Sequence, residues 1–270
     1  MKMPLLNGQV YYMERRLYEN LLELVKLNNK DYDSLILVTG AVGSGKSTLG
    51  VQVHTAINPG FNLDNLSFNG EDFEDKVVNK LRNFDGVQVD EAVDGMNAKE
   101  HYRQINIRIE KLLAKMRLKN LYITACMPRL KDFSEFTIHR ASLWLKCFTI
   151  KKERGFFVGF SPKRLQQTYY GEKAKKSMKR LRYNFRGRFF DGLCNIGKEE
   201  YKIAKSQAFI DYYNKTGRKL TKTPDHMDIA IKLKQKGFGP AEISRILNKP
   251  DSTVSDWLRK QPGSLEKTDF

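Results

Sequence analysis

The residues with the clearest potential for chemistry form a glycine-rich segment early in the chain. This segment fits the pattern G-x-x-x-x-G-K-[ST]. Its glycines permit positive φ angles, so successive backbone N–H groups can turn toward one bound anion. A lysine and a hydroxyl at its end suit a polyphosphate and its metal ion. The pattern predicts a phosphate loop for ATP made by Gly40, Ala41, Val42, Gly43, Ser44, Gly45, Lys46, Ser47 and Thr48.

The residues around the loop supply the context that the chemistry requires. The apolar run Leu35-Ile36-Leu37-Val38 precedes it, and residues 47–57 are compatible with a helix. A chance match in a glycine-rich loop would lack this order of strand, loop and helix. The positive end of the helix would face the same phosphates. Lys46 is expected to reach the β- and γ-phosphates, and Ser47 to ligate Mg²⁺.

Two adjacent acids follow a second short apolar segment. Asp90 and Glu91 come directly after Val87-Gln88-Val89, and ligands of open α/β sheets bind at the carboxyl ends of such strands. We expect Asp90 to hold Mg²⁺ through water and Glu91 to orient the attacking water as a catalytic base. The alternative is a pair of surface acids. The phosphate loop upstream favours the catalytic interpretation, because the acids would complete the metal site.

The hydrophobic periodicity alternates between strand-like and helix-like segments. Helices are expected over residues 10–28, 71–81 and 104–118, and strands over 34–39, 61–68, 87–89 and 121–125. Residues 144–150 and 155–160 are expected to pair as a hairpin. This order predicts an α/β fold of the P-loop NTPase type, a parallel sheet with helices on both faces, over residues 1–160.

Beyond these elements, the chain resembles the FtsK–HerA ATPases, and among them the zonula-occludens-toxin-like ATPases of viruses and mobile elements. The resemblance covers about residues 34–150 and rests on Asp90-Glu91-Ala92, Asn97, the segment 115–120, the strand 121–125 and Met127-Pro128. An adjacent Asp-Glu pair is typical of the P-loop division with an extra strand between the loop strand and the metal strand. The resemblance implies a motor that acts on DNA as a homo-oligomer, usually a ring.

Two features differ from these relatives. Many of them carry a γ-phosphate-sensing glutamine after the strand that here contains Thr124-Ala125-Cys126, so Thr124 or Cys126 would have to serve. Those of filamentous phages also carry a membrane helix, whereas no apolar run here approaches the roughly 18 residues that a span needs. Ring motors commonly take an arginine from a neighbouring subunit. The candidates are Arg117, ranked first, and Arg129 and Arg140.

Charge is distributed unevenly along the 270 residues, whose formal net charge is +17. Residues 162–223 hold seventeen Lys or Arg against five Asp or Glu, interleaved with tyrosines and phenylalanines. We interpret residues 161–223 as a basic helical arm and linker that contacts nucleic acid. The alternative is a solvated arm. For its aromatic residues, packing on the ATPase core is the favoured interpretation.

A three-helix pattern occupies residues 224–262. It resembles the helix-turn-helix of resolvases and transposases in the form G-F-G-P-A-E-I-S-R-I-L…S-T-V-S-D-W-L. The resemblance implies a small all-α DNA-binding domain. A small helical bundle that binds protein is the alternative. The residues expected to face the major groove are Ser252, Thr253, Ser255, Asp256 and Arg259.

Together these patterns predict an ATP-hydrolysing, DNA-binding protein of a virus or mobile element that moves, packages or remodels DNA. An ATP-switched DNA-binding adaptor and a nucleotide-sensing transcriptional regulator remain as alternatives. A metabolite kinase would not require the charge or the helix-turn-helix. Three scattered cysteines and the lack of a secretory segment lead us to expect a reduced, cytoplasmic protein.

Overall fold

A computed structural model gives the arrangement of the chain. It describes residues 1–5, 8–32, 34–90, 103, 106–112, 119–174, 182–215, 226–235 and 237–259. The chain divides into two compact units, Met1–Lys202 and Ile203–Phe270.

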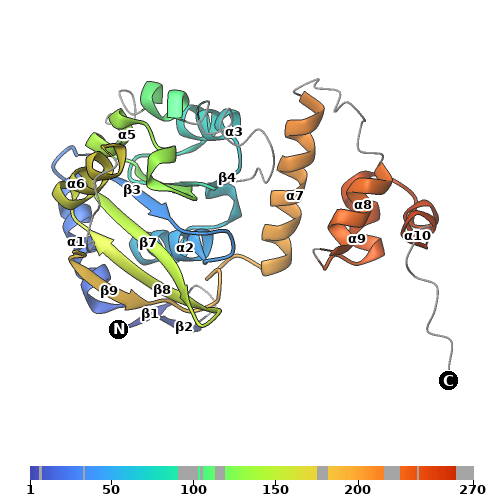
Figure 1. Cartoon of the computed structure of the whole chain (residues 1–270), viewed down its shortest axis with the longest axis horizontal. Coiled ribbons are helices and arrows are strands. Elements are labelled where there is room, and N and C mark those ends of the chain that lie inside the picture. Colours follow the sequence, from blue (N-terminus) through green and yellow to red (C-terminus); the bar gives the residue numbers. More distant parts are fainter. Residues whose placement is uncertain are drawn as a thin grey trace. The chain divides into compact units, whose positions relative to one another are not determined.

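The first unit is built on a seven-stranded sheet with the order β4-β5-β6-β3-β7-β8-β9, in which β3 is the central strand (Figure 1). The strands from β4 to β7 run parallel, whereas β8 and β9 are antiparallel additions at one edge. A separate two-stranded ribbon joins β1 and β2. The strands are β1 (Lys2–Pro4), β2 (Val10–Tyr12), β3 (Ser34–Thr39), β4 (Leu66–Ser67), β5 (Gly86–Val89), β6 (Tyr122–Met127), β7 (Leu143–Ile150), β8 (Glu153–Phe160) and β9 (Phe185–Arg188).

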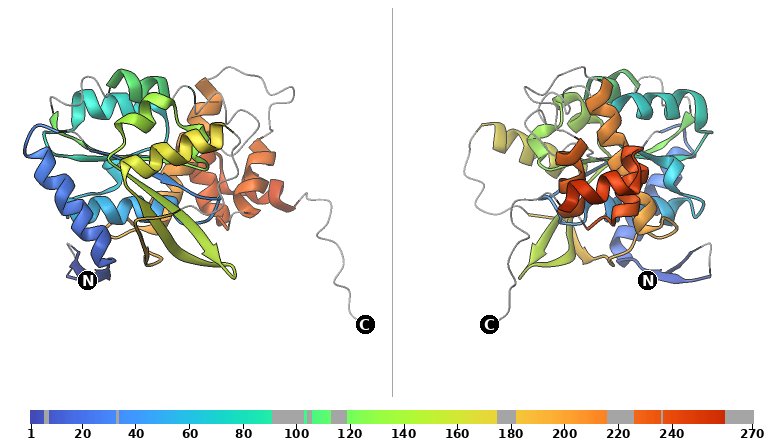
Figure 2. Two further views of the ribbon diagram at one scale, coloured as in Figure 1. Left: turned by 60° about the vertical axis from the view of Figure 1, so that its left-hand side comes forward. Right: turned by 90° about the vertical axis from the view of Figure 1, so that its right-hand side faces the viewer.

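Helices cover both faces of this sheet (Figure 2). Along β3, Leu35 and Leu37 point into one core and Ile36 and Val38 into the other, as the two-residue period of a strand requires. Helices α3, α5 and α6 contribute to the first core, and α1 and α2 to the second. These helices are α1 (Arg15–Asn28), α2 (Lys46–Ile57), α3 (Gly70–Asp75), α5 (Glu135–Arg140) and α6 (Pro162–Lys173). The π-helix η2 (Lys76–Lys80) continues α3, and η1 (Leu63–Asn65) and η4 (Leu130–Asp132) are short 3-10 helices. The expected α/β class is confirmed.

The strand order places β6 between β3 and β5. The segment after β3 and the acid after β5 therefore leave the same carboxyl edge of the sheet, one strand apart. Val38 pairs with Cys126 on one side of β6, and Val89 pairs with Ala125 on the other. The glycine-rich loop after β3 and Asp90 after β5 must therefore approach each other across the width of β6.

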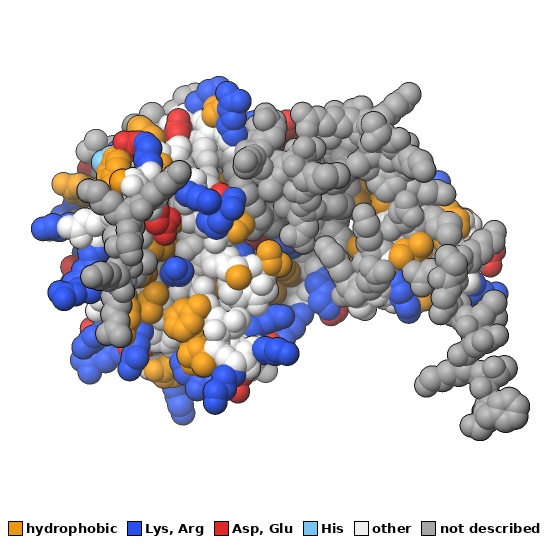
Figure 3. Space-filling model, viewed as in Figure 1, with side chains coloured by type: hydrophobic (Ala, Val, Ile, Leu, Met, Phe, Trp, Pro, Cys, Tyr) orange, Lys and Arg blue, Asp and Glu red, His pale blue; other side chains and the backbone are white. Residues whose placement is uncertain are grey.

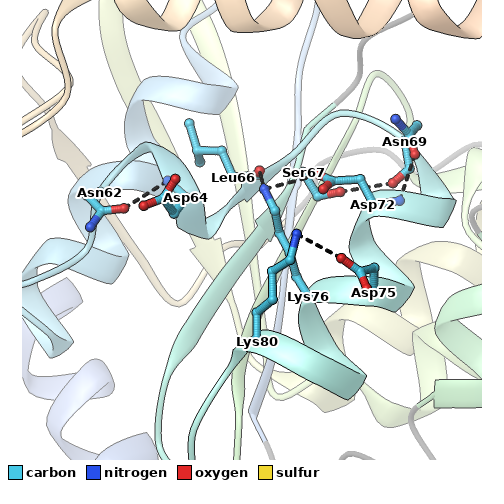
Figure 4. Close-up of polar contacts among 9 residues, drawn as sticks. All are labelled: Asn62, Asp64, Leu66, Ser67, Asn69, Asp72, Asp75, Lys76 and Lys80. Carbon is cyan, nitrogen blue, oxygen red and sulfur yellow. Dashed lines mark hydrogen bonds and ion pairs between the residues drawn. The ribbon is translucent and has the colours of Figure 1, made fainter.

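The edge strand β4 is short because polar caps flank it (Figure 4). Asn62 caps η1, and the Asn69 side chain accepts from the backbone N–H of Asp72 at the start of α3. The Lys76 ammonium donates to the Leu66 carbonyl and pairs with Asp72 at 3.1 Å. The strand expected over residues 61–68 is therefore limited to Leu66–Ser67.

Two other expectations for the first unit need correction. The helix expected over 10–28 begins only at Arg15, because Val10–Tyr12 pairs with β1 instead. The unit also continues to Lys202 rather than ending near residue 160. Its extension includes β9, whose Phe185 is buried in the core under α1 and β8. The basic composition of this segment reflects its exposed positions, whereas its buried aromatic residues belong to the sheet.

The expected helix over residues 104–118 falls largely outside the described residues. Positions 103 and 106–112 are helical, and Ile109 and Leu112 are buried in the core. The hairpin expected over 144–150 and 155–160 is confirmed by β7 and β8, which pair from Trp144 with Phe160 to Ile150 with Glu153.

The second unit contains three short helices around one apolar cluster. They are α8 (His226–Gln235), α9 (Pro240–Leu247) and α10 (Asp251–Arg259). The cluster includes Ala230 and Leu233 from α8, Ile243 from α9 and Val254 from α10. Asn248 adopts a left-handed conformation that ends α9, which permits the sharp turn into α10. The long helix α7 (Lys198–Lys215) begins in the first unit, and its residues from Ile203 onward are assigned to the second.

Among the described residues, no helix is long and apolar enough to cross a membrane. No disulfide joins any of the three cysteines, all of which the structure describes, and burial raises the pKa of Cys147 to about 12.

Candidate functional site

The backbone of the glycine-rich loop connects β3 directly to α2. The loop follows Thr39, and α2 begins at Lys46. Gly40, Gly43 and Gly45 have φ angles of 153°, 76° and 92°. A Cβ atom on Gly40 would lie 2.6 Å from the Cys147 carbonyl oxygen. The strand–loop–helix geometry expected from the sequence is therefore present, and it requires glycine where the chain turns.

Several polar groups of the loop could donate hydrogen bonds to a bound anion. The Lys46 ammonium donates to the carbonyl oxygens of Gly40 and Ala41, at 3.0 and 3.3 Å. The Ser44 hydroxyl is buried and has no hydrogen-bond partner among the described residues. No side chain caps the first turn of α2, whose N-cap is Gly45. An orphaned hydroxyl, a lysine and uncapped helix amides together fit a bound phosphate.

Asp90 lies at the end of β5 and contacts the start of α2. The Ser47 hydroxyl donates to Asp90 Oδ1 at 2.8 Å. The Asp90 backbone N–H donates to the Ser67 carbonyl oxygen of β4 at 2.7 Å, and the residue is only 1% exposed. Gln88 supports the pair from below, because its amide nitrogen donates to the Ser47 carbonyl at 3.2 Å. The two residues predicted to serve the metal ion are thus in direct contact.

Tyr201 reaches the same carboxylate from the first turn of α7. Its hydroxyl donates to Asp90 Oδ2, and its ring lies against Phe68 at a centroid distance of 5.6 Å. Burial raises the pKa of Tyr201 well above its usual value, the Asp90 charge and the hydrogen bond to Asp90 add to this rise, and the nearby Ser47 hydroxyl partly opposes it. Sequence reasoning missed Tyr201, because a tyrosine in a basic segment carries no signal for a partner 111 positions away.

Two further side chains approach the loop from the antiparallel edge of the sheet. The Phe189 ring lies on Gly45, and a Cβ atom there would be 2.7 Å from Phe189 Cζ. The Arg154 guanidinium, from the start of β8, lies 3.8 Å from the position of a Cβ on Gly43. Arg154 therefore brings a positive charge to the loop from within the same chain. The sequence predicted neither contact.

The remaining predicted residues fall into two groups. Glu91 and Arg117, together with Asn97, lie outside the described residues. Of the other arginine candidates, Arg129 pairs with Asp132 at 2.8 Å, and Arg140 is exposed at the end of α5. Arg129 directly follows Pro128, whose carbonyl oxygen accepts from the Gly40 N–H at 3.1 Å, whereas Arg140 lies at the end of α5.

The two γ-phosphate-sensing candidates differ in their placement on β6. Thr124 is fully buried under α2, where its Cγ2 atom would lie 3.3 Å from a Cβ on Gly50. It lies inside the strand rather than at the strand's end. Cys126 is nearer the carboxyl edge of the sheet, one residue before the end of β6.

The five residues predicted to face DNA lie on α10 away from its core. Val254 is the buried member of that helix, whereas Ser252, Asp256 and Arg259 are exposed and Thr253 and Ser255 half-buried. Their side chains are therefore available for contacts outside the unit.

Among the described residues, no group of three or more His, Cys, Asp or Glu side chains could hold a metal ion. The oxygen donors that meet at the start of α2 among the described residues include the Ser47 hydroxyl and the Asp90 carboxylate. This set fits Mg²⁺, which keeps several waters and takes further ligands from substrate phosphates. Comparison of the chain with protein-family models and with curated proteins finds no match.

Substitution of Gly45 tests whether the loop conformation is required. Gly45→Ala should lower the melting temperature and abolish ATP binding, because the new Cβ would overlap the Phe189 ring in a backbone with φ of 92°. Gly8→Ala is the matched control, since Gly8 has φ of 80° but nothing within 4 Å of a Cβ. Thermal unfolding and equilibrium binding of ATP would be measured on both. Equal behaviour of the two variants would show that the loop tolerates a side chain.

Proposed function

We propose that this chain is an ATP-hydrolysing P-loop protein that binds DNA. The observation that carries the proposal is the joint placement of the loop and Asp90. The positive-φ glycines lead into α2 at Lys46, and Ser47 donates to Asp90 at 2.8 Å. A phosphate cradle and a metal carboxylate meet at one point of the sheet edge, where ligands of open α/β sheets bind.

Each residue would have a defined part in binding the nucleotide. The loop N–H groups and the N-terminus of α2 would hold the phosphate oxygens, and the Lys46 ammonium would leave the Gly40 carbonyl for the β- and γ-phosphates. Ser47 and Asp90 would hold Mg²⁺, the hydroxyl directly and the carboxylate through water. When bound, Mg²⁺ polarises the transferred phosphoryl group. Arg154 would add a second cation beside the loop.

Hydrolysis requires a base that orients water. Glu91 follows Asp90 directly in the sequence and is the proposed base. The strand order also supports this class of ATPase, because β6 lies between the loop strand β3 and the metal strand β5. The resemblance to the FtsK–HerA ATPases suggests a motor that works as a ring, with Arg117 acting on a neighbouring subunit. Cys126 is the proposed γ-phosphate sensor.

DNA is the proposed partner because the net positive charge of the chain and the exposed residues of α10 both suit a nucleic acid. The chain carries a formal net charge of +17, and lysine and arginine side chains surround apolar ones on the face with β8 and β9 (Figure 3). Arg186 and Arg188 of β9 are exposed there. In the second unit, α10 exposes Arg259 and hydroxyl-bearing residues of the kind that contact bases. An ATP-switched adaptor, in which hydrolysis only resets a DNA complex, is the second candidate. The exposed α10 residues support this adaptor as much as they support a motor.

Steady-state turnover of ATP tests the enzyme. Lys46→Ala should remove binding and turnover, because it deletes the charge on the β- and γ-phosphates. Glu91→Gln should keep Mg–ATP binding but lower turnover by about 10²–10⁴-fold, as expected for loss of a general base. Lys30→Ala, which removes an exposed charge elsewhere, is the control. Near-normal turnover by Lys46→Ala would contradict the proposal. Stimulation by DNA with ring assembly would select the motor, and single turnover with ATP-dependent assembly the adaptor.

DNA binding by the full chain should separate into two terms. Arg259→Ala with Ser255→Ala should reduce the preference between DNA sequences, because base contacts carry the specificity. Arg186→Ala with Arg188→Ala should instead lower the salt dependence of binding, by about one unit of slope for each lost phosphate contact. Affinities across a salt series measure both. Unchanged preference in the first variant would show that α10 does not contact bases.

A further inference from the structure

Tyr201 is hydrogen-bonded to the carboxylate that is proposed to hold the metal ion. The two oxygens of Asp90 are each taken by one hydroxyl, Oδ1 by Ser47 and Oδ2 by Tyr201. The Tyr201 hydroxyl also lies near enough to the Ser47 side chain, the other proposed metal group, to interact with it. Nothing in the sequence pattern of the phosphate loop or of the acid pair requires a tyrosine there.

The two hydroxyls have different consequences for a metal ion. A hydroxyl oxygen that ligates Mg²⁺ can still donate its proton to a carboxylate, so the Ser47–Asp90 hydrogen bond is compatible with the bound ion. Tyr201 is in a different situation, because Mg²⁺ keeps several waters that must hydrogen-bond to the carboxylate. Such waters would compete with the Tyr201 hydroxyl for Asp90 Oδ2.

We propose that Tyr201 closes the metal site in the absence of Mg–nucleotide and must leave Asp90 when the ion binds. This inference rests on the proposed function and adds a regulatory contact to the same site. The contact would also affect helix α7, because Tyr201 lies in the first turn of α7. Its backbone N–H donates to the Gly197 carbonyl oxygen at 3.0 Å. Release of the hydroxyl would loosen this turn, so the start of α7 would respond to the metal-bound nucleotide and not to nucleotide alone.

The test compares Tyr201→Phe with the wild-type full chain. The variant keeps the ring that packs on Phe68 and removes only the competing hydroxyl. We expect the Mg²⁺ concentration that gives half-maximal binding of a non-hydrolysable ATP analogue to fall about tenfold, in line with loss of a hydrogen bond to a charged group. Binding of the analogue in EDTA should not change. Tyr11→Phe is the matched control, because it removes a buried hydroxyl that donates to the Gln52 carbonyl of α2, away from Asp90.

A second measurement follows the helix itself. Amide hydrogen exchange over residues 198–206 of the wild type should increase on addition of Mg²⁺ with the analogue, and should not change with the analogue in EDTA. An unchanged or higher Mg²⁺ requirement in Tyr201→Phe would overturn the inference, as would protection of residues 198–206 by Mg–nucleotide. Either result leaves the proposed function intact if the wild type binds the analogue. Failure of the wild type to bind it would reject the proposed function instead.

Discussion

The hydrogen bond between Ser47 and Asp90 joins two segments that lie 43 positions apart, and the geometry of the first unit serves to make it. Ser47 is fixed because α2 begins immediately after the glycine-rich loop. Asp90 is fixed because β5 ends there and its N–H is held by Ser67 of the edge strand β4. Either residue alone would be an ordinary polar group at the end of an element. Together they meet at the point where we propose that the phosphates and the magnesium ion are held.

The central strands explain why the contact spans a whole strand. Because β6 lies between β3 and β5, the loop and the start of α2 must pass over the carboxyl end of β6 for Ser47 to contact Asp90. The space beneath is filled by buried polar side chains, since Gln88 and Thr124 both lie under Gly50 of α2. A Cβ atom on Gly50 would be 2.3 Å from Gln88 Oε1, so glycine at this position lets α2 approach the sheet closely. The antiparallel edge then adds Phe189 and Arg154 beside the loop.

The parts of the fold that follow from local chemistry could be predicted from the sequence. The apolar run before the glycine pattern predicted β3, and the helix-compatible segment after it predicted α2. The short apolar run Val87-Gln88-Val89 predicted that Asp90 follows the end of a strand. The first unit extends past the boundary that was expected near residue 160. The change in composition there comes from exposed lysine and arginine residues, and it does not mark the end of the buried core. The buried Phe185 of β9 still completes the sheet. Tyr201, Phe189 and Arg154 reach the site through long-range packing, which no periodicity or spacing encodes.

Equilibrium binding of a series of ligands that differ only in phosphate number would show whether the loop recognises phosphate groups. The full chain would be titrated with ATP, ADP, AMP and adenosine in the presence of Mg²⁺. If the loop holds the phosphates through Lys46, the helix amides and the Ser47–Asp90 pair, affinity should fall steeply between ADP and AMP and be lost for adenosine. Equal affinity for adenosine and ATP, or no binding of ATP, would contradict the account.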